Sequence, residues 1–178
     1  MGTTKAAPSN VPPPNTQTVI QVEAFVEGDG CDRIPEVTIT QYQTWLQTWL
    51  QALQLQLSPI NAYEVSLRLT NDAEIQQLNT DYRQQAKPTD VLSFAALETD
   101  IPGADALHQE QPLYLGDIII SVETAARQAP ASDHSLTQEI AWLSAHGLLH
   151  LLGWDHPDDA SLARMLEKQA QLLSLITL

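Results

Sequence analysis

Four stretches of the chain carry the hydrophobic patterns of β-strands, in which polar and apolar positions alternate or a short apolar run is bounded by turn residues. They run from Val19 to Phe25, from Ala62 to Thr70, from Val91 to Ala96 and from Leu115 to Val122. The last stretch contains Ile118, Ile119 and Ile120 in succession, which favours a buried central strand.

Five further stretches favour helices, several of them with an apolar residue at every third or fourth position. They run from Thr40 to Leu57, onward from Asn71, from Val122 to Gln128, from Leu136 to Leu152 and from Asp159 to Leu175. Asn71 is an effective N-cap, and Glu74 follows at the spacing of a capping box. Together these elements predict an α+β fold, with about five helices packed on a small mixed four-stranded sheet.

The start of the chain and one long loop differ from this pattern. Residues 1–17 contain four prolines and no hydrophobic period, which predicts a disordered N-terminal tail. Residues 18–178 are expected to form one domain, because 178 residues suit a single core. The loop from Glu98 to Pro112 is longer than most compact domains carry, which is typical of a mobile or functional segment.

The composition limits the compartment and the binding partners that we expect for this protein. The formal net charge is −14, so the surface disfavours loose binding to nucleic acid and to anionic membranes. The single cysteine, Cys31, excludes a disulfide within the chain and disfavours a cysteine-based metal site. No apolar stretch approaches the ~20 residues that span a bilayer, and the N-terminus lacks a signal-peptide pattern. We therefore expect a cytoplasmic protein without a membrane partner.

Three of the five histidines lie within eleven residues, at positions 146, 150 and 156. His146 and His150 are one helical turn apart, so both rings can reach one metal ion at ~2.0–2.1 Å. Gly153 tolerates the left-handed backbone that ends a helix, which allows His156 to return to the same point. Three nitrogen ligands leave a fourth position open, as in catalytic zinc sites, although nickel or copper fits the same ligands. The segment therefore predicts one zinc site on a helix and the following turn.

The same histidine spacing occurs in zinc peptidases with the pattern H-E-x-x-H-x-x-G-x-x-H. The glutamate base of that pattern is Gly147 here, and no residue matches its turn methionine clearly, which disfavours peptide hydrolysis. Cleavage of a phosphodiester depends less on such a base and more on stabilisation of the phosphoryl charge by a metal and an arginine. Arg83 is the candidate arginine, although it can equally cap the carbonyls at the end of its helix.

Three blocks together resemble the YbeY family of endoribonucleases, the ribosomal RNA maturation factors. They are Tyr82-Arg83 with the Pro-Thr-Asp-Val-Leu-Ser-Phe segment at 88–94, Leu-Gly-Asp-Ile-Ile-Ile-Ser at 115–121, and the histidine block at 146–156. Their order and spacing agree with the family, and the resemblance covers roughly residues 18–175.

The resemblance implies a cytoplasmic, zinc-dependent endoribonuclease specific for single strands, with no DNA substrate. Such enzymes act in 3′-end maturation of small-subunit ribosomal RNA and in ribosome quality control. It also implies that His146, His150 and His156 bind the metal and that Arg83 is catalytic, in a cleft facing the metal. Two alternatives remain open, a zinc peptidase and a non-catalytic ribosome-assembly factor with a structural metal.

Residues 60–130 contain four basic residues against eleven acidic ones, so tight RNA binding by long-range electrostatics is not expected. We expect the four cations to gather at the cleft, and ribosomal or small-subunit proteins to supply docking. The four are Arg68, Arg83, Lys87 and Arg127.

Smaller candidates have two interpretations each. Asp155 either receives a hydrogen bond from a ligand histidine or is a turn residue. Trp154 either stacks on a base or belongs to the core or cleft wall. His108 and His134 lie outside the motif and are expected at the surface.

Overall fold

The structure is a computed structural model that describes residues 21–28, 37–98 and 110–178. The predicted N-terminal tail, Cys31, His108 and most of the predicted 98–112 loop lie outside the described residues.

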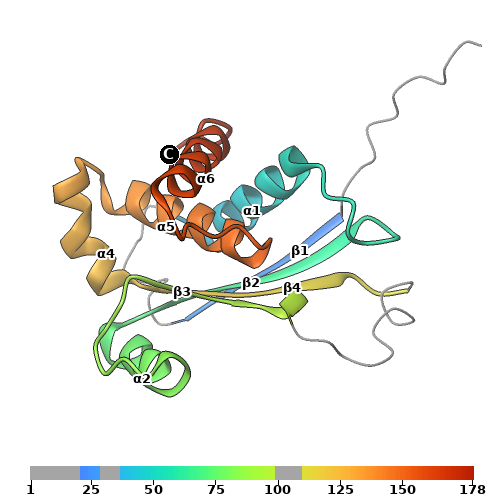
Figure 1. Ribbon diagram of the computed structural model, residues 1–178. Coiled ribbons are helices and arrows are strands. Elements are labelled where there is room, and N and C mark those ends of the chain that lie inside the picture. The colour runs from blue at the N-terminus through green and yellow to red at the C-terminus, as the bar shows by residue number, and fades with distance from the viewer. Residues whose placement is uncertain (1–20, 29–36, 99–109) are drawn as a thin grey trace, which may run out of the picture.

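Within the described residues the strands form one mixed four-stranded sheet in the order β1-β2-β4-β3 (Figure 1). The strands are β1 (Gln21–Glu27), β2 (Ala62–Thr70), β3 (Val91–Ala95) and β4 (Leu113–Ser121). β1, β2 and β4 are parallel neighbours, and β3 pairs antiparallel with β4 at the sheet edge. The mixed sheet is thus confirmed, and so is the central position of the isoleucine run, in which Ile118 and Ile120 are fully buried.

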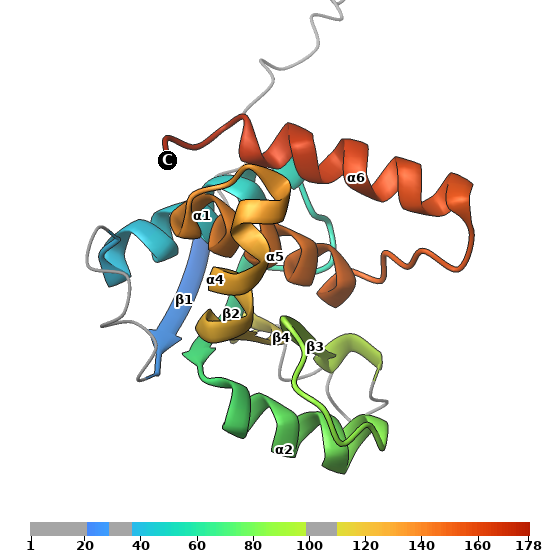
Figure 2. The ribbon, with the colours of Figure 1, turned by 90° about the vertical axis from the view of Figure 1, so that its left-hand side faces the viewer.

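The helices cover the two faces of the sheet unequally. Helices α1 (Ile39–Leu53), α5 (Leu136–Leu151) and α6 (Asp159–Leu173) lie on one side, and α2 (Asp72–Arg83) lies on the other (Figures 1 and 2). The short helix α4 (Val122–Gln128) follows β4, and two 3-10 turns span Ala96–Glu98 and Ala129–Ser132. The α+β prediction is confirmed, and no described helix is long and apolar enough to cross a membrane.

The main core lies between the sheet and the three-helix side. Alternate residues of β2 point into it, and α1 and α5 contribute apolar side chains from the helical side. These residues include Tyr63, Val65, Leu67, Leu69, Trp49, Leu46, Leu148 and Leu149. Burial of this apolar surface is the main force that holds the helices on the sheet.

The first helix ends earlier than the apolar period predicts. Gln54 adopts a left-handed backbone with φ 47° and ends α1 after Leu53, so Leu57 does not join the apolar face and is 52% exposed. The backbone N–H groups of Leu57 and Ser58 donate instead to the Tyr63 hydroxyl, each at 3.1 Å. Tertiary hydrogen bonds thus replace the predicted last helical turn.

Helix α2 packs on the opposite face through a small second cluster made by Ile75, Leu92 and Ile119. Asn71 caps its start by accepting from the Glu74 N–H at 3.0 Å. The predicted reciprocal half of the capping box does not form, because the Glu74 carboxylate binds Thr70 and Arg68 instead.

Candidate metal centre

Helix α5 approaches the sheet closely because of a glycine between its two histidines. A Cβ atom at Gly147 would lie 2.7 Å from Ile118 Cγ2 and 3.1 Å from Ser93 Oγ. The Ser93 hydroxyl also donates to the Gly147 carbonyl at 3.3 Å. Position 147 therefore faces the sheet, with His146 and His150 half-buried on the same helix.

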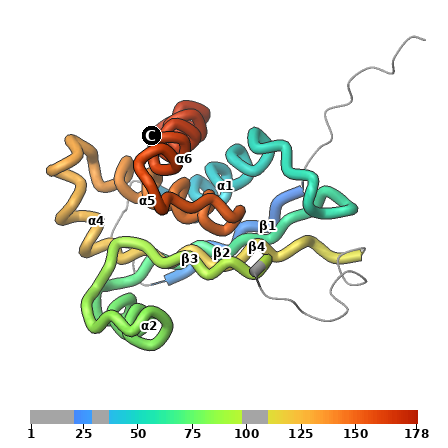
Figure 3. The backbone as a smooth tube through the Cα atoms, viewed as in Figure 1, coloured from blue at the N-terminus to red at the C-terminus, as the bar shows by residue number. Residues whose placement is uncertain are grey.

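The turn after α5 is a Schellman motif. The Gly153 N–H donates to the His150 carbonyl and the Trp154 N–H to the Leu149 carbonyl, both at 3.0 Å. Gly153 has φ +82°, as the sequence predicts. In Figure 3 the chain then turns back, and α6 runs beside α5. The turn brings His156 to the two helical histidines.

The three imidazole rings converge. Their ligand nitrogens all lie within 4.8 Å of one another, and the Nε2 atoms of His146 and His150 are 3.1 Å apart. Tetrahedral zinc with bonds of ~2.0–2.1 Å separates its ligand nitrogens by about 3.4 Å. His156 completes the set, with its ring centroid 5.6 Å from that of His146 and 5.2 Å from that of His150. The donor set and its spacing fit one transition-metal ion.

Burial lowers the pKa of both helical histidines. For His146 the neighbouring His156 lowers the pKa further, while Gln169 and the charge of Asp90 oppose the shift. For His150, burial is again the largest cause of the lowered pKa, and the other two histidines add to it. Both rings therefore stay neutral to a lower pH than a free imidazole, as metal ligands must.

A cleft of about 430 Å³ opens beside the histidines, and Arg83 lines it. The cleft is also lined by Ser93, Ala95, His150, Gly153, Trp154, Asp155 and His156. Arg83 is exposed at the end of α2, whose last carbonyls, of Asn79 and Thr80, are capped by the Gln84 N–H. No carboxylate among the described residues pairs with Arg83, so its guanidinium is available to an anion in the cleft.

Comparison with known proteins places this geometry in a family. The sequence matches the family model described as Endoribonuclease YbeY over residues 31–177. The chain belongs to the YbeY endoribonuclease family. Endoribonuclease YbeY of a Picosynechococcus species is 53% identical over 162 residues, which are 91% of this chain and 98% of that protein. Endoribonuclease YbeY of Trichormus variabilis is 55% identical over 169 residues, covering 89% of this chain and 96% of that protein.

A solved structure shares the fold. The solution structure of TM1509 from Thermotoga maritima superposes with a TM-score of 0.54 at 24% identity, covering 86% of this chain and 87% of that one. The named activity of the YbeY relatives is internal cleavage of RNA, so the predicted membership of an enzyme family is confirmed.

The helix has no room for the glutamate of the peptidase pattern. That glutamate would occupy position 147, where even a Cβ atom meets Ile118 and Ser93. The structure thus gives a steric reason for the glycine that the sequence places there.

Of the four cations expected to gather at the cleft, Arg83 lines it and Arg68, Lys87 and Arg127 do not. Arg68 pairs with Glu74 at 2.7 Å, and Arg127 pairs with Asp72 at 2.8 Å. Both neutralise carboxylates of α2, and Arg83 is the described basic residue that lines the cleft. The cleft therefore carries less positive charge than the sequence suggested.

The structure gives an outcome for each described residue among the smaller candidates. The Asp155 carboxylate accepts from the backbone N–H of His156 at 2.8 Å, which is the turn interpretation. Trp154 lines the cleft and packs against the core. His134 is not a plain surface residue, because its Nδ1 lies 2.8 Å from the buried Glu139 carboxylate.

Gln169 is the site residue that sequence reasoning missed. Its Oε1 lies 3.2 Å from His146 Nδ1, and its side chain is buried on α6. The available signal was a polar residue on the apolar face of that helix, between Met165 and Leu172.

Proposed function

We propose that this protein is a zinc-dependent endoribonuclease specific for single strands, with His146, His150 and His156 as metal ligands and Arg83 as the catalytic arginine. One observation carries the proposal, namely that a single cleft joins the histidine cluster to Arg83 of α2, which pairs with no carboxylate of the described residues. Three neutral donors suit zinc, and family membership supplies the RNA substrate class.

Each residue has a distinct task in this proposal. The three histidines would hold the ion beside the cleft. A bound zinc ion would act as a Lewis acid, which polarises oxygen ligands and lowers the pKa of zinc-bound water to about 7. Arg83 binds the scissile phosphate and offsets the negative charge that grows on its oxygens. Trp154 and Ser93 form part of the cleft wall beside these groups.

We also propose 3′-end maturation of small-subunit ribosomal RNA and ribosome quality control as the cellular role, in the cytoplasm. The net charge of −14 disfavours long-range attraction of RNA, so docking on ribosomal proteins is part of this proposal. Residues 18–178 would act as one catalytic domain, preceded by a tail at 1–17.

The test compares wild type, His150→Ala and Arg83→Ala on a single-stranded fragment of small-subunit ribosomal RNA, with bound zinc counted in each sample. Arg164→Ala is the matched control, because Arg164 is an exposed arginine of α6 outside the cleft lining. His150→Ala is expected to lose zinc and cleavage. Arg83→Ala is expected to keep zinc and to lose about 10²–10³ in rate, as for removal of one oxyanion donor.

Equal cleavage by all four proteins would overturn the proposal and identify a contaminating nuclease. Folding that depends on zinc, with no cleavage by any sample, would favour an assembly factor with a structural metal. In active samples the product ends identify the nucleophile, because attack by the 2′-hydroxyl leaves a 2′,3′-cyclic phosphate.

A further inference from the structure

The apolar face of α6 carries one buried amide. Gln169 is 1% exposed and lies between the buried residues Met165 and Leu172. Burying a primary amide is costly unless its donors and acceptor find partners. Its partners therefore indicate why a glutamine stands where helix packing alone would favour an apolar residue.

The orientation of this amide follows from its surroundings. Its Nε2 donates to the Trp142 carbonyl at 2.8 Å, and a carbonyl can only accept. The opposite flip would set the Gln169 oxygen against that carbonyl oxygen. The Gln169 Oε1 must therefore face the other partner, His146 Nδ1, at 3.2 Å.

An amide oxygen also only accepts, so His146 Nδ1 must carry the hydrogen. The lone pair of a neutral His146 is then on Nε2, the atom that lies 3.1 Å from His150 Nε2. The Trp142 ring restrains the same imidazole from its face, at 5.6 Å between centroids and 5° between planes. The tautomer and the ring direction are both those needed for a metal between the histidines.

We propose that Gln169 is a positioning residue of the metal centre, which holds His146 in the Nδ1–H tautomer with Nε2 aimed at the ion. The proposal rests on the metal site of the proposed function but not on RNA cleavage. Residues that hydrogen-bond to a metal-ligating histidine typically contribute 10–100-fold to metal affinity. Helix α6 would therefore be a functional part of the site in addition to packing on the core.

The experiment uses Gln169→Met, which keeps an unbranched side chain of similar length but removes the amide. Gln171→Met is the matched control, because Gln171 is an exposed glutamine of the same helix that pairs with Lys168. Zinc affinity is measured by competition with a chromophoric chelator, and the His146 tautomer by ¹⁵N imidazole NMR of the metal-free protein.

We expect Gln169→Met to bind zinc about 10–100-fold more weakly. Gln171→Met should match wild type. In metal-free wild type, His146 should show the Nδ1–H pattern. Wild-type affinity in a folded Gln169→Met protein would overturn the proposal.

An Nε2–H tautomer in metal-free wild type would also overturn the proposal, even if Gln169→Met does not fold. A wild-type protein that binds no zinc would instead overturn the metal site of the proposed function. The NMR measurement still decides the role of Gln169 in that case, so the two failures are distinguishable.

Discussion

Two glycines in the histidine segment are required for different reasons. Gly147 is required by space, because a side chain there would enter the sheet at Ile118. Gly153 is required by conformation, since it has φ +82° and a Cβ atom there would meet nothing within 4 Å. At Gly153 the cost of a side chain is therefore backbone strain alone.

Gly153→Ala tests this residue-scale assignment. Alanine in a left-handed conformation costs roughly 1–2 kcal/mol, so the free energy of unfolding of the metal-free protein should fall by about that amount. Zinc affinity should fall as well, because the turn directs His156. Gly153→Asn should lose less, since asparagine tolerates this region. Urea unfolding and chelator competition measure both effects, and an unchanged Gly153→Ala protein would contradict the assignment.

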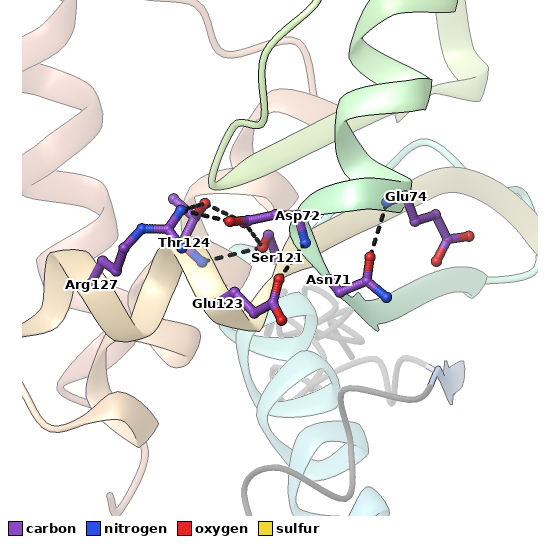
Figure 4. A network of polar contacts seen from close by, with 7 residues as sticks. All are labelled: Asn71, Asp72, Glu74, Ser121, Glu123, Thr124 and Arg127. Carbon is purple, nitrogen blue, oxygen red and sulfur yellow. Dashed lines mark hydrogen bonds and ion pairs between the residues drawn. The ribbon is translucent and has the colours of Figure 1, made fainter.

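At the scale of elements, one carboxylate joins the starts of two helices (Figure 4). Asp72 in the first turn of α2 accepts from the hydroxyls of Ser121 and Thr124, each at 2.6 Å. Arg127 of α4 pairs with its second oxygen at 2.8 Å. Burial alone would raise the pKa of Asp72, but these hydrogen bonds and the Arg127 charge lower it below its ordinary value. The network ties α2 to α4.

Thr124→Val should weaken this junction in a pH-dependent way. A hydrogen bond to a charged group contributes about 1.5–3 kcal/mol. The free energy of unfolding at neutral pH should therefore fall by roughly that amount. Because the folded-state pKa of Asp72 is lowered, the stabilisation is complete above the unfolded value of 3.8 and is lost as the pH falls through the folded value.

The difference between wild type and Thr124→Val should therefore shrink in acid, as measured by urea unfolding over a pH series. Thr44→Val is the control, because the exposed Thr44 hydroxyl donates to the Thr40 carbonyl of its own helix. A difference that stays constant down to a pH of about 2, below the carboxylate range, would argue against the Asp72 network.

At the scale of the whole molecule, the site joins both faces of the sheet. Arg83 comes from α2 on one face, and the histidines come from α5 and its turn on the other. The edge strand β3 contributes Ser93 and Ala95 to the cleft between them. Arg83 is the described basic residue in the cleft lining, so under the proposed function substrate selection would depend on docking elsewhere.

Zinc should stabilise the whole domain in a pH-dependent manner. At a free concentration of 100 times Kd the expected gain is about 2.7 kcal/mol, and chelation should remove it. The lowered pKa of His146 and of His150 keeps both rings neutral near pH 7, and protons should displace the metal as the pH falls below about 6.

Thermal unfolding with and without chelator measures this effect, and His150→Ala should not respond to chelator. Stoichiometric zinc retained at a pH of about 4, well below the histidine range, would exclude the three-histidine site.

The features that the sequence determined by itself are local. The periods of the strands and helices, the His146–His150 spacing, the Gly153 turn and the Asn71 cap all act within a few residues, where backbone geometry dictates the outcome. The histidine spacing predicted the metal site, and the family motifs added the catalytic role of Arg83; both remain predictions.

Tertiary structure decided what depends on distant partners. The Tyr63 hydroxyl binds the chain beyond α1, and Glu74 pairs with Arg68 instead of closing its capping box. Arg83 and the histidines line one cleft although they lie on opposite faces of the sheet. Gln169 reaches His146 from 23 residues away. Such contacts follow from how helices pack on the sheet, and no local period carries that information, because a buried polar group selects its partner by proximity in space.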